Sequence, residues 1–265
     1  MAKADRTLAP AKLTRTFRVT GRRDDGYHLV EAEMVALDLA DELEFAEGEG
    51  LDVVDAIRWI GPGQAEATLA AVPVGENLVV RALGLVGRTA HVRLVKRIPP
   101  GAGLGGGSSD AAAVLRWAGV RDHRLASRLG ADVPFCLLGG RARVRGIGEI
   151  VEPLVPADVT VVLVTPAFGV STTAVYAAFD EVGAPPRGAS MNDLEKAALV
   201  VEPRLARYRD LLAEASQQRP MLAGSGATWF VESEPRRAPR IAGEVRDAIV
   251  STGLRAVIEI ARAVG

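Results

Sequence analysis

The residues with the clearest chemical meaning lie in one glycine-rich segment, "PPGAGLGGGSSDAAAVL", at residues 99–115. Successive glycines permit positive φ angles and let several backbone N–H groups point at one place. The alanine-rich tail predicts a helix, whose first turn offers unpaired N–H groups and a positive dipole end to an anion. Ser108 and Ser109 add hydroxyl donors. The segment therefore predicts a cradle for phosphate groups, and a close packing contact or a flexible glycine turn that caps the helix are the alternatives.

The neighbouring residues predict a strand, a glycine loop and a helix in that order. Val92 and Leu94 alternate with polar residues before the loop, as in a half-buried strand. The stretch "SSDAAAVLRWAG" has a polar opening, good helix formers and a closing glycine. The common phosphate-binding loop ends in "GK[ST]", which is absent from this segment, and the acidic residue of the dinucleotide fingerprint is also missing. The loop therefore belongs to another class of phosphate-binding segment.

Further along the chain, turn residues separate several predicted elements. "VTVVLVTP" from Val159 predicts an apolar strand, "NDLEKAALV" predicts a short helix opened by Asn192, and "MLAGSGATWFV" predicts a second glycine turn leading into a strand. "VGAPPRGAS" is typical of a surface loop.

Two other stretches bear on the organisation of the chain. "LEFAEGEGLDVV" indicates two strands joined by an acidic, glycine-rich hairpin loop. The turn-rich "IVEPLVPAD" predicts a soft domain boundary, which divides the chain into residues 1–155 and 156–265.

Composition limits the classes of function. The chain has 265 residues, of which 48% are hydrophobic and 25% charged, so it can build a large core in one or two domains. The net charge of −1 argues against a nucleic-acid or anionic membrane partner. The single cysteine, Cys136, excludes an internal disulfide and fits a reducing compartment. No stretch reaches the roughly 18 apolar residues of a membrane span, and the N-terminus lacks a signal-peptide core, so we expect a cytoplasmic protein.

Five segments together resemble one enzyme family. They are "APAKL" at residues 9–13, "GRRDDGYHLVEAEMVALDLADELEF" at 21–45, "PPGAGLGGGSSDAA" at 99–112, "LGADVPFCLLGGRARVRGIGEIVEPL" at 129–154 and "AGSGATWFV" at 223–231. In type, order and spacing they resemble the motifs of the GHMP kinases, and the likeness covers most of the chain. The triple glycine before the two serines resembles the branch of that family that phosphorylates a cytidyl-linked methylerythritol in the non-mevalonate isoprenoid pathway.

The resemblance implies an α+β, two-domain GHMP kinase fold. An N-terminal α/β domain would carry the phosphate loop, a C-terminal α+β domain would follow, and the active site would lie in the cleft between them. The implied reaction is phosphoryl transfer from ATP with Mg²⁺ to an alcohol group of a small-molecule substrate. Oligomeric state does not follow from the sequence.

The resemblance also assigns roles to particular residues. Asp132 would be the base that accepts the proton of the alcohol, and Lys12 would hold Asp132 ionised and stabilise negative charge near the acceptor. The implied ATP-binding residues are Asn77, Pro99, Pro100, Gly101, Ala102, Gly103, Leu104, Gly105, Gly106, Gly107, Ser108 and Ser109. The implied substrate-binding residues are Tyr27, His28, Tyr176, Gly224, Ser225 and Gly226, with the aromatic residues around a cytosine base. No protein-bound metal site is implied, and Mg²⁺ would arrive with the nucleotide.

Two of these positions have a simpler interpretation. Asn77 is equally suited to be a plain helix cap, and Tyr176 to be a helix residue packed on the core.

Two departures from the family pattern keep other functions open. Thr14 stands where the family has asparagine, two residues after the motif lysine, and the connection from Ser109 to Asp132 is short. One alternative is a GHMP kinase for another small alcohol, which would keep Lys12, Asp132 and the loop. The other is a catalytically impaired nucleotide-binding paralogue.

Overall fold

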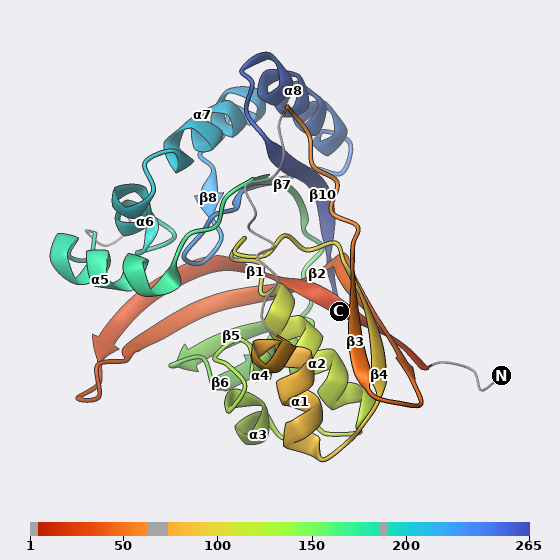
Figure 1. The fold of residues 1–265 in the computed structure, drawn as a ribbon. Helices are drawn as coiled ribbons and strands as arrows, with labels where there is room; N and C mark the ends of the chain where they lie inside the picture. Colours follow the sequence, from red (N-terminus) through yellow and green to blue (C-terminus); the bar gives the residue numbers. More distant parts are fainter. Residues whose placement is uncertain (1–4, 63–73, 186–189) are drawn as a thin grey trace.

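Two long antiparallel strands, β1 (Asp5–Arg22) and β2 (His28–Ala46), run through the structure, which is a computed structural model describing residues 5–62, 74–185 and 190–265 (Figure 1). They are joined by the turn before Tyr27, in which Gly26 has a φ of +90°. Residues 11–14 of β1 and 34–37 of β2 are buried on both faces, whereas the first and last residues of each strand are partly or fully exposed. We call this pair of strands the spine, and both halves of the chain add further elements to it.

The N-terminal half adds further strands and a layer of helices to this spine. The strands are β3 (Gly50–Asp55), β4 (His91–Lys96), β5 (Arg141–Gly146) and β6 (Ile150–Pro153). The helices are α1 (Leu78–Val86), α2 (Gly106–Trp117), α3 (His123–Ser127) and α4 (Val133–Leu138), after a short 3₁₀ turn at Val74–Glu76. These helices gather on one side of the strands (Figure 1). The predicted strand, glycine loop and helix are thus confirmed as β4, the loop and α2.

The predicted hairpin after β2 is wrong in its pairing. Both strands exist, but β4 lies between them, antiparallel to β2 and parallel to β3. The acidic turn residues reverse the chain, yet β4 forms hydrogen bonds with both strands. A local turn pattern carries no information about a strand that arrives some forty residues later, and this explains the error.

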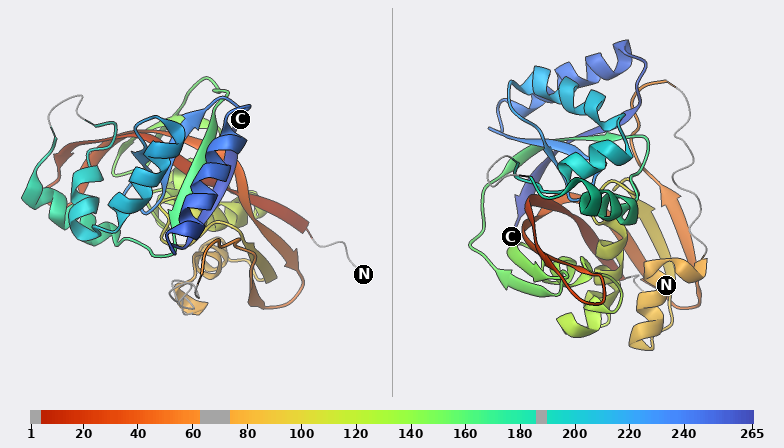
Figure 2. Two further views of the ribbon diagram at one scale, coloured as in Figure 1. Left: turned by 90° about the horizontal axis from the view of Figure 1, so that it is seen from above. Right: turned by 90° about the vertical axis from the view of Figure 1, so that its left-hand side faces the viewer.

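The C-terminal half forms a smaller antiparallel sheet under helices. Its strands are β7 (Thr160–Pro166), β8 (Met221–Leu222), β9 (Trp229–Ser233) and β10 (Ala256–Val264). Its helices are α5 (Thr172–Val182), α6 (Glu195–Val201), α7 (Leu205–Ser216) and α8 (Ala238–Ser251). Every residue of β7 is buried, which explains its continuous apolar run. Helices α7 and α8 lie side by side (Figure 2).

Strand β10 joins the two halves. It pairs with β7 along most of its length, and its last residues, Ala263 and Val264, pair with Leu37 and Ala36 of β2. The described strands therefore form one ten-stranded sheet, in which β1, β5 and β6 branch from a path that runs β3-β4-β2-β10-β7-β9-β8. The division at residues 155 and 156 stays a prediction, and the predicted surface loop at 182–190 falls partly outside the described residues.

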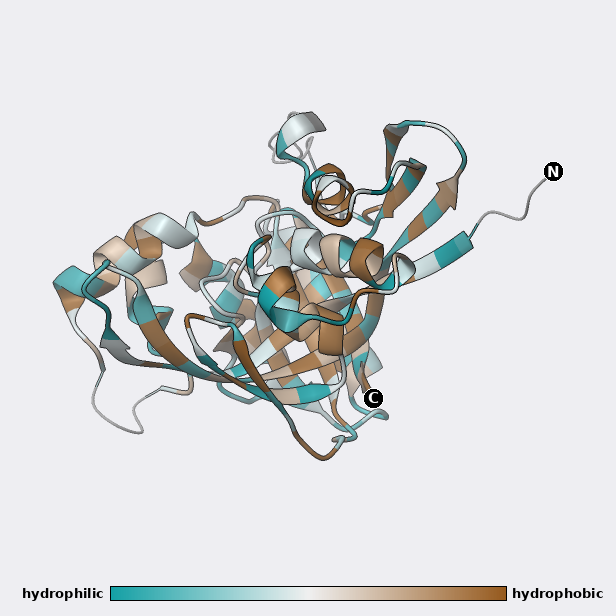
Figure 3. Ribbon diagram, turned by 90° about the horizontal axis from the view of Figure 1, so that it is seen from below, coloured by the Kyte–Doolittle hydropathy of each residue, from teal (hydrophilic) through white to brown (hydrophobic). Residues whose placement is uncertain are grey.

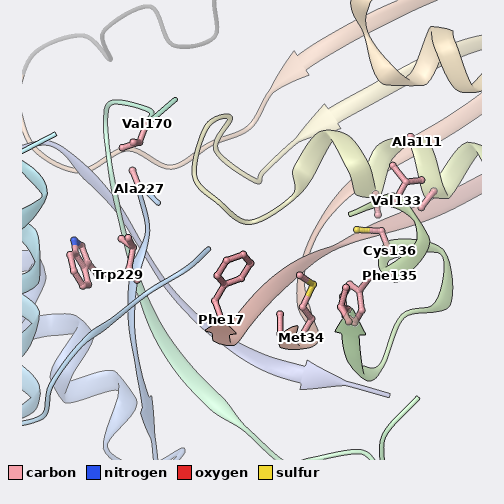
Figure 4. Close-up of a cluster of buried hydrophobic side chains, with 14 of the residues drawn as sticks. Phe17, Met34, Ala111, Val133, Phe135, Cys136, Val170, Ala227 and Trp229 are labelled. Atoms are coloured by element: carbon pink, nitrogen blue, oxygen red, sulfur yellow. The ribbon is translucent and has the colours of Figure 1, made fainter. Parts of the chain in front are cut away.

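The apolar residues form two cores. The larger lies between the sheets and their helices and includes Phe17, Met34, Phe135 and Trp229 (Figure 4). Apolar and polar segments alternate along several strands, as expected where one face is buried (Figure 3). The smaller core joins β1, β2 and β7 to the glycine loop through Ala102 and Leu104. Among the helices of the described ranges, none is long and apolar enough to cross a bilayer.

Candidate active site

The glycine loop between β4 and α2 alternates between turning residues and anchoring residues. Gly101, Gly103 and Gly105 have φ angles of +65°, +77° and +66°, in the region that favours glycine. Between them, Ala102 and Leu104 are 2% and 1% exposed and belong to the smaller core. The alternation in "GAGLG" thus fixes the loop to the core through every second side chain. A flexible hinge does not fit this arrangement.

The glycines of the loop are also required by the packing of the protein itself. A Cβ on Gly103 would lie 2.3 Å from the backbone oxygen of Ala223, and one on Gly105 would lie 2.6 Å from Cγ of Lys12. Both contacts are far shorter than van der Waals distance. Close packing and a phosphate cradle, first treated as alternatives, are therefore compatible uses of the same residues.

Helix α2 begins directly at the loop and presents its N-terminus there. Its cap, Gly105, has no side chain, and the N–H of Ser109 donates to the carbonyl of Gly105 at 2.9 Å. The N–H groups of residues 106–108 precede that first helical bond and are available to an anion. The hydroxyl of Ser109 is already engaged, because it donates to the carbonyl of Pro10 at 2.6 Å and anchors α2 to β1. Ser108 is half-buried, and its contact with a phosphate stays a prediction.

Lys12 of β1 contacts Asp132 at the start of α4. Lys12 Nζ lies 3.3 Å from Asp132 Oδ2, with the lysine side chain 7% and the aspartate side chain 33% exposed. The backbone N–H of Lys12 donates to the carbonyl of Leu104 at 3.0 Å, so the lysine is tied to the glycine loop. The short connection from Ser109 to Asp132 does not separate the predicted pair.

Thr14 has a direct role beside this pair. Its side chain is buried, and its hydroxyl accepts a hydrogen bond from Lys12 Nζ at 3.2 Å. The threonine therefore provides Lys12 with an oxygen acceptor at the position where the family has an amide.

The second glycine turn, at residues 223–228, packs against the first. The N–H groups of Ala227 and Thr228 donate to the carbonyls of Gly101 and Ala102 at 3.3 and 3.0 Å. Gly224 has a φ of +60°, and a Cβ there would lie 3.5 Å from Lys12 Nζ. Ser225 Oγ is 2.9 Å from Thr172 Oγ1 at the start of α5. Gly224 thus faces Lys12 and the loop, whereas Ser225 contacts α5.

Asn192 holds this turn in place, a role beyond the predicted helix opening. It is 3% exposed, and its Nδ2 donates to the carbonyls of Leu222 and Gly224 at 2.8 and 2.7 Å. Its Oδ1 accepts from the N–H of Leu194 at 2.9 Å, just before α6. Local sequence indicates only the helix start, because the glycine turn follows some thirty residues later.

His28 and Tyr176 form an aromatic pair, and Tyr176 lies near enough to Asp132 to be affected by its charge. Their rings stack with centroids 4.8 Å apart and an interplanar angle of 24°. Burial, and secondarily the negative charge of Asp132, raise the pKa of Tyr176 to about 12. Tyr176 also packs against the larger core, so both interpretations of this residue apply. Tyr27 is 61% exposed and makes no ring contact within the described residues.

Asn77 acts as a helix cap. Its side-chain oxygen accepts from the N–H of Val79 at 2.9 Å at the start of α1. The predicted contact with adenine stays a prediction.

A buried charge cluster of Asp41, Lys96 and Asp110 lies beneath the glycine loop, and sequence reasoning missed it. Lys96 Nζ donates to Asp41 and, at 2.7 Å, to Asp110, and it lies 3.2 Å from where a Cβ of Gly106 would be. Asp41 also accepts from two backbone N–H groups, of Arg97 and Ile98. The second oxygen of Asp110 is buried without a partner among the described residues, and burial raises the pKa of this carboxyl to about 7.

Comparison with known proteins agrees with this geometry. The model of the GHMP kinases N terminal domain matches residues 77–140. A 4-diphosphocytidyl-2-C-methyl-D-erythritol kinase of Paracoccus denitrificans is 41% identical, covering 90% of this chain and 92% of the relative. The enzyme of the same name from Paramagnetospirillum magneticum is 38% identical, covering 84% and 86%. A crystal structure of 4-(cytidine 5'-diphospho)-2C-methyl-D-erythritol kinase matches with 34% identity and a TM-score of 0.74, covering 98% of this chain and all of the other.

The fold and site therefore define a GHMP kinase, which uses ATP as its phosphoryl donor. More narrowly, the chain belongs to the family of 4-diphosphocytidyl-2-C-methyl-D-erythritol kinases. The predicted family and the predicted α+β fold class are confirmed.

Proposed function

We propose that the chain transfers the γ-phosphoryl group of ATP, bound with Mg²⁺, to the 2-hydroxyl of 4-diphosphocytidyl-2-C-methyl-D-erythritol. The observation that carries this proposal is the position of the Lys12–Asp132 pair. The stem of Lys12 packs against Gly105 of the loop, and the charge of Asp132 acts on the hydroxyl of Tyr176. One pair of charged side chains thus lies between the N-terminal end of α2 and the aromatic pair of His28 and Tyr176.

On the ATP side, the N–H groups of the first turn of α2 and the hydroxyl of Ser108 bind phosphate oxygens, and residues 99–109 wrap the phosphates. Mg²⁺, when bound, offsets negative charge on the β- and γ-phosphates. The described residues include no group of three or more His, Cys, Asp or Glu side chains placed to hold a metal. Mg²⁺ favours nucleotide oxygens and water as ligands, and Ser108 would be the side chain of the cradle that reaches the ion or a phosphate oxygen.

On the acceptor side, Asp132 takes the proton of the alcohol as the new O–P bond forms. Lys12, with its ammonium group between Asp132 and Thr14, keeps that carboxylate in place and offsets charge on the transferring group. Tyr27, His28 and Tyr176 bind the cytosine base, and this remote binding energy positions the hydroxyl. Ser225 and its neighbours Gly224 and Gly226 complete the acceptor side.

A panel assay of ADP release tests the proposal. ATP and Mg²⁺ are supplied with the cytidyl-linked acceptor, free methylerythritol phosphate, homoserine or mevalonate, and the site of phosphorylation is read by ³¹P and ¹³C NMR. Turnover confined to the cytidyl-linked acceptor is expected. Preference for another alcohol would favour a GHMP kinase that acts on a different small alcohol. ATP binding without transfer to any alcohol would favour a catalytically impaired nucleotide-binding paralogue.

A further inference from the structure

The imidazole of His28 is held from three directions by one helix. Tyr176, Phe179 and Asp180 occupy positions i, i+3 and i+4 of α5, so they lie on one face of that helix. Tyr176 stacks on the imidazole, Phe179 meets it edge-on at a centroid distance of 6.0 Å, and Asp180 Oδ1 lies 2.7 Å from Nε2. Helix α5 lies beside the end of the β1–β2 pair from which His28 projects (Figure 1).

Asp180 itself is oriented by a second partner. Arg22, near the end of β1, places Nη1 3.2 Å from Oδ2 of Asp180, which leaves Oδ1 to His28. The His28 side chain is only 10% exposed, whereas that of Asp180 is 34% exposed. The carboxylate is thus a fixed group at the rim of the acceptor side, and the ring that it contacts is largely buried.

The chemistry of this contact determines which nitrogen of His28 carries the proton. An ionised carboxylate can only accept hydrogen bonds, and a neutral imidazole has one N–H donor and one acceptor nitrogen. The contact with Asp180 therefore places the proton on Nε2 and leaves Nδ1 as an acceptor. No described residue forms a hydrogen bond with Nδ1.

We propose that Asp180 is a positioning residue that determines base specificity, by making Nδ1 of His28 an acceptor for the exocyclic amino group of cytosine. This inference rests on the proposed function, in which the acceptor alcohol carries a cytidyl group. Uracil has a carbonyl oxygen where cytosine has the amino group, so it would place one acceptor against another. Sites built around a hydrogen bond reject analogues that cannot form it, because the polar groups are left unpaired.

Matched acceptors test the inference. The ratio of kcat/KM for the cytidyl-linked acceptor to that for its uridyl analogue is measured at pH 8 for the wild type, Asp180→Ala, Asp180→Glu and Asp52→Asn. Asp52 is the control because it pairs with another imidazole, His91 at 3.3 Å, on the β3–β4 edge. We expect Asp180→Ala to lower the ratio at least about tenfold, through the KM for the cytidyl acceptor, with the KM for ATP unchanged. Asp180→Glu should retain most of the preference, and Asp52→Asn all of it.

The tautomer is observed directly by ¹⁵N NMR. The chain has only three histidines, His28, His91 and His123, so the His28 signals can be assigned by substituting each in turn. Wild-type His28 protonated at Nε2 alone, and a loss of that preference in Asp180→Ala, would support the inference. A protonated Nδ1 in the wild type, or an unchanged base ratio in a folded Asp180→Ala, would overturn it.

Binding of CMP and UMP, measured by calorimetry, separates this inference from the proposed reaction. If the wild type phosphorylates neither acceptor, the proposed function fails. A preference for CMP that is lost in Asp180→Ala would still support the role of Asp180, and equal binding of the two nucleotides would contradict it.

Discussion

The two sides of the Lys12–Asp132 pair are formed by different kinds of contact. On the phosphate side, the glycine loop is held by the turn at residues 223–228, and these contacts are made by backbone carbonyl and N–H groups. On the acceptor side, His28, Tyr176 and Asp180 meet through side chains, and Asp180 is about one third exposed.

This difference fits what we propose that each side binds. Every nucleoside triphosphate presents the same phosphates, and a fixed array of N–H groups suits them, but such an array depends on the surrounding fold. A particular base is recognised by side chains, which can change without disturbing the backbone. Substitutions on the phosphate side should therefore damage stability and ATP binding together, whereas those on the acceptor side should alter the acceptor alone.

The largest effect is expected where the two sides meet. Asp132→Asn removes the proposed proton acceptor, and general-base assistance contributes about 10² to 10⁴ in rate, so kcat should fall at least about a hundredfold. Lys12→Met keeps the stem that packs on Gly105 and removes only the charge, and it should cost a similar factor. The two losses should not add in the double variant, because both residues serve one proton transfer. Steady-state kinetics with separate ATP calorimetry measures this, and near wild-type turnover in Asp132→Asn would refute the mechanism.

A glycine on the phosphate side gives the next largest effect. Gly103→Ala forces a side chain into a φ of +77° and a Cβ to within 2.3 Å of the Ala223 carbonyl oxygen. Strain and overpacking together should lower the free energy of unfolding by about 2 to 5 kcal/mol, and ATP binding should weaken with it. Gly243, by contrast, lies within α8, and the methyl group of Gly243→Ala meets nothing within 4 Å. This change should raise the free energy of unfolding by about 0.5 to 1 kcal/mol, because alanine loses less conformational freedom than glycine in a helix. Urea unfolding measures the free energy of unfolding of both variants. Equal values for the two would contradict the packing argument.

The glycine loop also shows which features of the fold could be predicted from the sequence. The strand, glycine loop and helix at residues 91–117 were predictable because hydrophobic alternation, successive glycines and alanine-rich periodicity are all local signals. The pairing of β3 with β4 could not be predicted. The hairpin pattern indicates that β3 pairs with β2, but β4, which is distant in sequence, lies between these two strands.

The residues of the candidate site also divide into those that could be predicted from the sequence and those that could not. Lys12 and Asp132 were predictable from motifs, and the structure brings their charged groups to 3.3 Å. Asn192 and Asp180 were not singled out for their roles, because each acts on a group far away in the sequence: Gly224 in one case and His28 in the other. Buried charges such as Lys96 were also missed, since a lysine or aspartate in a sequence is normally expected at the surface.

The acceptor side offers a test with a smaller effect. Tyr176→Ala removes a ring whose stacking on a base is worth about 1 to 3 kcal/mol, so the KM for the cytidyl acceptor should rise about 5- to 150-fold. The KM for ATP should stay unchanged, because the residue lies on the acceptor side of Asp132. Tyr176→Phe keeps the ring and should retain most of the affinity. A parallel rise in the KM for ATP would contradict the separation of the two sides.

The smallest effect concerns the buried charge under the phosphate loop, and it is read from pH. Two carboxylates share Lys96, and Asp110, with one oxygen unpartnered, has a pKa raised by burial from 3.8 to about 7. Between these values the folded state binds a proton that the unfolded state has released. The contribution of this group to stability is therefore complete at the acid end and is lost as pH rises to neutrality, by at most about 1.4 kcal/mol per pH unit.

Asp110→Asn cannot release that proton, so its free energy of unfolding should decline less than that of the wild type between pH 5 and pH 8. The difference between the two proteins isolates Asp110, because they differ at that residue alone. Asp52→Asn, at a carboxylate that is 68% exposed, should follow the wild type at each pH. Urea unfolding at half-unit steps measures the three curves. Parallel curves for Asp110→Asn and the wild type would mean that Asp110 stays ionised beside Lys96 throughout this range, and that a buried negative charge is tolerated beneath the loop that we propose binds phosphate.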